Sequence, residues 1–187
     1  EQEMFLVDRA YNASPTALEL IDRVDDPHFT TELGLFNLEM NADPQPLEGS
    51  GLARMEAQLT VLYARVQKCA AELHVQPVLT GILPTLARTD LSIDNMVPNP
   101  RYLTLNRVMR QAKGDGYDIS IKGLDELVAK HDSLMFEACN ASFQVHLQSL
   151  DPSRFGHDYD VAQLVIAPTL AIATNSPTLL GKRLWAE

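Results

Sequence analysis

The last six residues of segment 33–41 alternate between apolar and polar side chains. The apolar positions are Phe36, Leu38 and Met40, and the polar positions are Asn37, Glu39 and Asn41. Successive side chains of a β-strand point to opposite faces, so this pattern predicts a strand with one buried and one polar side. Because such a strand needs a second layer over its apolar face, we expect a sheet covered by other elements.

Other segments supply further strands and the covering helices. Strands are expected at 1–8, 77–83 and 117–122, with one or two more within 132–148. Helices are expected at 15–24, at 50–73, at 102–112 and at 159–174, and 89–100 has the breakers of a loop. Ser14 should cap the first helix, and Pro168 should kink the last. These elements predict a single α+β domain over residues 1–187.

Composition excludes several classes of protein. Asp and Glu number 25 against 15 Lys and Arg, a formal net charge of -10, so neither nucleic acid nor a membrane surface is an expected partner. No stretch approaches the roughly twenty apolar residues of a membrane span, and no signal peptide opens the chain. Cys69 and Cys139 lack the paired spacing of a zinc site, which favours buried thiols in the cytoplasm.

The polar faces of several predicted strands carry groups that bind ions or substrates. These are Glu1 and Glu3, then Asn37, Glu39 and Asn41, then Gln144 and His146. The i, i+2 spacing keeps each set on one side of its strand. Carboxylate oxygens suit Mg²⁺ or Mn²⁺, which would serve phosphoryl transfer. From alternation alone, however, a solvated sheet face explains the same pattern more simply.

Five short motifs, in order along the chain, carry a resemblance to a known family. Residues 1–8 resemble the Glu-x-Glu-Phe-x-x-Val-Asp strand that opens the catalytic domain of family-two glutamate–cysteine ligases, and 32–41 looks like their second strand. Segment 80–85 is similar to their Gly-Thr-x-Pro segment. Residues 144–146 stand where the family has His-Val-His or Gln-Val-Asn, and 173–183 resembles Ala-Asn-Ser-Pro followed by Gly-Arg. The likeness is strongest to bacterial members that can accompany CBS domains.

The resemblance implies a glutamine synthetase-like catalytic fold, a curved antiparallel sheet with helices on its outer face. The chain begins without Met and ends without a terminus signal, so we expect it to be the N-terminal part of that domain. The implied activity is that of an ATP-dependent carboxylate–amine ligase, as in glutathione biosynthesis, which forms an amide through an acyl phosphate. The implied partners are ATP, glutamate or a similar carboxylate, and an amine, while a homo-oligomer stays open.

The resemblance also assigns roles to residues, although it identifies no catalytic one. Metal ligands for Mg²⁺ or Mn²⁺ would be Glu1, Glu3, Glu39 and Gln144, and substrate contacts would be His146, Glu32, Asn37 and Asn41. Gln144 departs from the His-Val-His form, but an amide oxygen can still coordinate a metal. Two alternatives stay open: a catalytically silent ligand-binding relative, and a structural fragment whose polar strand face meets solvent.

Overall fold

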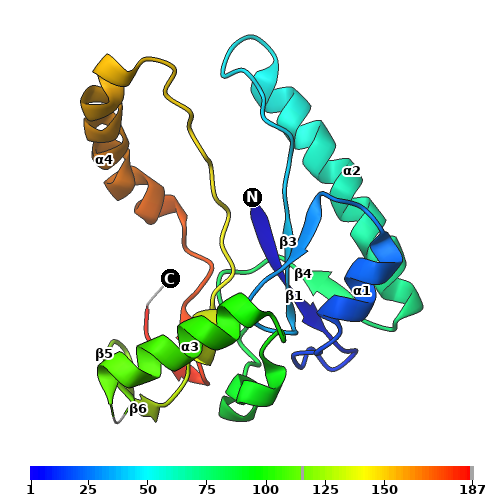
Figure 1. Ribbon diagram of the computed structural model, residues 1–187, viewed down its shortest axis with the longest axis vertical. Helices are drawn as coiled ribbons and strands as arrows, with labels where there is room; N and C mark the ends of the chain where they lie inside the picture. Colours follow the sequence, from blue (N-terminus) through cyan, green and yellow to red (C-terminus); the bar gives the residue numbers. More distant parts are fainter. Residues whose placement is uncertain (115, 186–187) are drawn as a thin grey trace.

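The computed structural model describes residues 1–114 and 116–185, and a four-stranded antiparallel sheet lies at its centre (Figure 1). Its strands are β1 (Gln2–Val7), β2 (Phe29–Thr31), β3 (Asn37–Met40) and β4 (Gln76–Val78), in the order β2-β3-β1-β4. The helices α1 (Ala17–Val24) and α2 (Gly51–Glu72) cover one face of this sheet. The predicted α+β class is therefore present, while the glutamine synthetase-like assignment stays a prediction.

Alternation along β1 divides the core in two. Met4 and Leu6 pack with Leu38 and Met40 against the apolar sides of α1 and α2. Phe5 and Val7 point to the other face, where residues of the 3₁₀ helices and of a hairpin bury them. Both faces of β1 are thus covered from Met4 onward, and its polar end is left open at Glu3.

The second core is built mostly from short elements. It contains residues of the 3₁₀ helices η1 (Arg88–Leu91) and η3 (Leu134–Cys139), together with the hairpin of β5 (Tyr117–Lys122) and β6 (Glu126–His131). The short 3₁₀ helix η2 (Ile93–Asn95) follows η1 and buries no residue. The helix α3 (Pro100–Lys113) begins where the side chain of Asn99 accepts a hydrogen bond from the backbone N–H of Arg101, with proline at the first helical position. A small hairpin of β7 (Thr178–Leu179) and β8 (Lys182–Arg183) closes against β6.

Helix α4 (Phe155–Ile172), preceded by η4 (Pro152–Arg154), stands away from both cores (Figure 1). None of its residues is buried by the described part of the chain, although it carries large apolar side chains such as Leu164, Leu170 and Ile172. The protein exposes 11827 Å² of surface. A compact monomer of 20.7 kDa should expose roughly 8,900 Å². The excess reflects α4 and the extended segment that leads to it.

Most predicted elements are present, and the differences have local causes. The first helix begins at Ala17 after Thr16, so Ser14 does not cap it. Phe36 precedes β3 and packs with Phe5, rather than on the face of Leu38 and Met40. The strand expected at 77–83 ends at Val78. Cys139 is buried as predicted, whereas Cys69 is only partly buried.

The prediction for 132–148 was wrong. Its first part forms η3, and the strand β6 lies before it, at residues where no strand was expected. Residues 142–144 then run beside β1, joined by hydrogen bonds from the Glu3 amide to the Ser142 carbonyl and from the Gln144 amide to the Glu1 carbonyl. Phe143, Val145 and Leu147 are exposed because no described layer covers them. Separately, no helix within 1–114 and 116–185 is both long and apolar enough to cross a bilayer.

Candidate functional site

Three carboxylates converge at the open end of the central sheet, on the face opposite α1 and α2. Glu3 of β1 and Glu39 of β3 are direct partners in the antiparallel register, and Glu32 follows the end of β2. One side-chain oxygen from each lies within 4.8 Å of those of the other two. All three side chains are partly buried. The topology therefore brings together acids that are up to 36 positions apart in sequence, from Glu3 to Glu39.

The charges in this cluster are not balanced by a described basic side chain. Burial, a hydrogen bond with Glu39, and the charges of Glu3 and Glu39 raise the pKa of Glu32 to about 8. Like charges at this separation cannot all be ionised at low cost unless a cation joins them. Carboxylate oxygens are the donors that Mg²⁺ and Mn²⁺ prefer, so the residues present fit a divalent metal ion.

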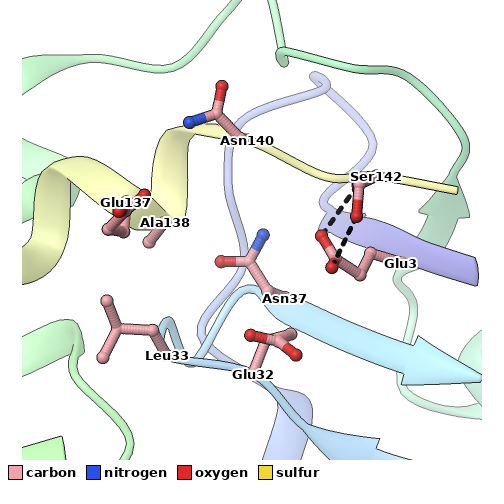
Figure 2. A pocket seen from close by; sticks show the side chains of 8 residues that line it. All are labelled: Glu3, Glu32, Leu33, Asn37, Glu137, Ala138, Asn140 and Ser142. Carbon is pink, nitrogen blue, oxygen red and sulfur yellow. Dashed lines mark hydrogen bonds between the residues drawn. The ribbon is translucent and has the colours of Figure 1, made fainter. Parts of the chain in front are cut away.

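The cluster opens into a pocket of about 330 Å³ (Figure 2). It is lined by Glu3, Glu32, Leu33, Asn37, Glu137, Ala138, Asn140 and Ser142. The lining thus holds three carboxylates and three neutral polar side chains, and none of these eight residues is basic. Substrate groups bound beside the carboxylates would meet a negative wall.

Neighbouring side chains fix the orientation of Glu3. Its two carboxylate oxygens accept hydrogen bonds of 2.7 Å from the backbone N–H and the hydroxyl of Ser142, drawn as dashed lines in Figure 2. The side-chain amide of Gln144 donates to Glu3 at 2.8 Å and to the Ser142 hydroxyl at 2.9 Å. Gln144 therefore supports Glu3 through its nitrogen, and its oxygen remains the atom that could serve as a ligand.

The outer part of the face contains two further pairs. Asn41 donates a hydrogen bond to Glu39 at 2.7 Å. Nε2 of His146 lies 3.0 Å from a carboxylate oxygen of Glu1, two residues before Glu3 on the same strand face. Both pairs extend the polar surface outward from the three-carboxylate cluster.

Asn37 is the most buried polar residue of the site. It is 2% exposed, and neither its Oδ1 nor its Nδ2 has a hydrogen-bond partner among the described residues. Figure 2 shows its side chain between Glu3, Glu32 and Asn140, directed into the pocket. A buried amide with no partner is costly, so its position at a pocket wall points to a bound ligand.

The eight predicted site residues therefore occupy one connected surface. The central cluster contains Glu3, Glu32 and Glu39, with Asn37 beside it, and Asn41, Gln144, Glu1 and His146 are joined to it or extend it. Glu32, predicted as a substrate contact, lies with the carboxylates predicted as metal ligands. Their individual roles stay predictions.

Three polar lining residues were not predicted as site residues. Ser142 precedes Gln144 by two positions, so the i, i+2 spacing already placed it on the same side. Glu137 and Asn140 belong to the end of η3, which had been predicted as a strand, and only the three-dimensional arrangement reveals them.

Comparison with known proteins agrees with the motifs. No curated protein and no solved structure shows a significant match to the chain. The family model described as "Glutamate-cysteine ligase family 2 (GCS2)" matches residues 1–187, the whole of the sequence. The chain belongs to glutamate–cysteine ligase family 2.

Proposed function

We propose that this protein takes part in ATP-dependent ligation of a carboxylate to an amine. The observation that carries the proposal is the cluster of Glu3, Glu32 and Glu39 beside a pocket large enough for a small substrate. Family membership supports a ligase of this type. A glutamine synthetase-like fold and a cytoplasmic location belong to the same proposal, and the antiparallel sheet with helices on one face supports the first.

Glu3, Glu32 and Glu39 would hold Mg²⁺ or Mn²⁺. When bound, such an ion neutralises negative charge on the phosphates of ATP and on the phosphoryl group in transfer. The reaction would join the γ-phosphoryl group of ATP to a substrate carboxylate oxygen, releasing ADP. An amine would then attack the acyl carbon, forming the amide and releasing phosphate.

The contribution of the protein's own groups is mostly positioning. Ser142 and Gln144 fix the rotamer of Glu3, and Asn41 does the same for Glu39. Donors that orient a ligating carboxylate are expected to matter nearly as much as the ligand itself. Asn37 and the outer pair of Glu1 and His146 remain available for substrate groups.

The test combines metal binding with turnover. The purified protein is titrated with Mn²⁺, and phosphate release from ATP is measured with glutamate and a panel of amino acids as amine donors. The proposal expects Mn²⁺ binding and phosphate release that depends on the amino acids, both lost in Glu39→Gln. Glu56→Gln, an exposed acid on α2, is the matched control and should leave both unchanged.

The outcomes separate the alternatives. Mn²⁺ binding without amino-acid-dependent phosphate release would indicate a catalytically silent relative. Absence of Mn²⁺ binding by the folded protein would exclude the metal site and, with it, the ligase proposal.

A further inference from the structure

We propose that two copies of this chain associate through the arm formed by residues 143–172, which contains an extended segment and helix α4. The proposal goes beyond the ligase function and depends on neither the metal nor the substrate. Figure 1 shows the arm projecting away from the two cores, and each of its two parts lacks a different kind of partner. A second copy of the same arm supplies both.

The extended segment, residues 143–150, offers a strand edge without a partner. At its start, the Gln144 amide donates to the Glu1 carbonyl, and the N-terminal ammonium group donates to the Gln144 carbonyl. Residues 145–150 form no backbone–backbone hydrogen bond with any residue that the structure describes. Unpaired N–H and C=O groups of an extended chain are a template for pairing with another strand.

The same segment exposes a row of apolar side chains. Phe143, Val145 and Leu147 alternate along it and Leu150 follows, with exposed fractions from 57% for Phe143 to 87% for Leu150. Alternate side chains of an extended chain lie on opposite faces, so the polar side contacts the candidate site and the apolar side is turned away from it. Such an apolar row requires a second layer.

Helix α4 requires an apolar layer on more than one side. No residue from Val161 to Ile172 is charged, and Leu164, Val165 and Ile166 are all exposed. Consecutive helical residues are turned by about 100° from one another, so these three side chains point in three directions. A helix that is apolar all round is normally buried, yet the described residues bury none of α4.

The two parts of the arm have matching lengths. Segment 143–150 spans at most roughly 26 Å when fully extended, and the 18 residues of α4 span about 27 Å. Two arms related by a two-fold axis can therefore pair their extended segments antiparallel and lay each helix over apolar side chains of the other copy. Both contacts are self-complementary, as a two-fold interface requires. The uncharged stretch 161–172 brings no like charges together, although each copy has a net charge of -10.

The exposed area of the protein matches what such a dimer needs. Its surface of 11827 Å² exceeds that of a compact monomer of 20.7 kDa by roughly 2,900 Å². If each copy buries about half of this excess, the interface removes roughly 2,900 Å² in total, within the roughly 2,000–5,000 Å² of permanent homodimers. A second copy therefore accounts for both the size and the chemistry of the exposed surface.

Sedimentation equilibrium of the full chain tests the proposal. Over roughly 1 to 100 μM, which covers dissociation constants near the micromolar range, the mass should approach twice 20.7 kDa. The double variant Leu164→Glu/Leu170→Glu places charges on the exposed surface of α4 and should weaken association at least about 100-fold. Val61→Glu, at an exposed position of α2 outside the arm, is the matched control and should leave the mass unchanged. Circular dichroism verifies the fold of each variant, since none of the substituted side chains is buried.

Hydrogen exchange locates the interface. Amides of residues 145–150 should exchange slowly at high protein concentration, and quickly after dilution and in the double variant, because their protection comes from the partner copy. A monomer over the whole concentration range would overturn the proposal and assign the arm to a different protein chain. A double variant that remains dimeric would also overturn it. So would a mass that keeps rising with concentration, because an antiparallel two-fold pairing closes at two copies.

Discussion

Glu3 and Glu39 lie directly opposite each other on the adjacent antiparallel strands β1 and β3. Like charges in this arrangement destabilise a sheet, and Glu32 adds a third carboxylate within 4.8 Å. Residues 4–7 of β1, and Leu38 and Met40 of β3, are apolar and well buried, which supplies the stability that this arrangement removes. A cation bound between the carboxylates would relieve this local repulsion. Loss of one of the three acids should therefore raise the stability of the metal-free protein and lower its affinity for the metal.

Glu39→Gln tests this opposition. The substitution keeps the size of the side chain and removes one of the converging negative charges, so the metal-free protein should unfold at a higher temperature. Mn²⁺ affinity should fall by more than about tenfold, or roughly 1.4 kcal/mol, because a ligand is lost. Thermal unfolding in EDTA and calorimetric titration measure the two effects. A lower unfolding temperature in EDTA than that of the Glu56→Gln control would contradict the charge argument.

The raised pKa of Glu32 predicts a pH dependence. Its ordinary value is 4.5 and burial beside Glu39 and Glu3 raises it to about 8, so the folded state holds a proton that the unfolded state has lost. Stability of the metal-free protein should therefore fall as the pH rises from about 4.5 to 8. Glu32→Gln should flatten this slope in EDTA. An unchanged slope in that variant would show that the carboxyl is ionised normally in the fold.

His28 should contribute a second, independent slope. Its Nδ1 lies 2.7 Å from Asp26, and this hydrogen bond, with Asp43 near the other ring nitrogen, raises the pKa of His28 above 6.5. Its stabilising contribution is complete below pH 6.5 and is lost as the pH rises through the folded-state pKa. An NMR titration of the ring should give a pKa above 6.5. His28→Gln should remove this part of the slope and leave that of Glu32 intact.

Periodicity predicted the regular elements and the polar face. Alternation at 33–41 identified β3, and an apolar run with an acidic beginning at 1–8 identified β1. Helical spacing of apolar residues identified α2, because one side of this helix packs against the sheet. The face that holds Glu3, Glu39 and Asn41 could thus be predicted without coordinates, since it depends only on the period of a strand.

Elements fixed by tertiary contacts could not be predicted in this way. Residues 134–139 contain too few polar positions to show a period, and they form η3 because Met135, Ala138 and Cys139 fit the second core. The exposed Phe143 and Val145 alternate as a strand would, but no described layer covers them. Glu137 and Asn140 line the pocket because residues 134–139 form η3 rather than a strand, so the sequence pattern could not identify them.

Gly34 should be needed to hold Asn37 in place. A Cβ added at Gly34 would lie 2.5 Å from Oδ1 of Asn37, 3.1 Å from Cβ of Ala138 and 3.2 Å from Cζ of Phe36. The last two contacts are inside the core, so the amide of Asn37 is the group most able to move, out of the pocket. Overpacking of this kind costs roughly 1–3 kcal/mol. Each kcal/mol lowers Tm by roughly 2–4 °C in a protein of this size.

Because Asn37 is one of the proposed substrate contacts, Gly34→Ala should lower glutamate affinity about tenfold, while Mn²⁺ affinity stays near that of the wild type. Gly156→Ala is the matched control, because a Cβ there meets no atom within 4 Å on the exposed helix α4. Calorimetry with glutamate and Mn²⁺, beside thermal unfolding, measures both consequences. A lowered Tm with unchanged glutamate affinity would mean that Asn37 contributes to packing alone, because its displacement would then leave ligand binding intact.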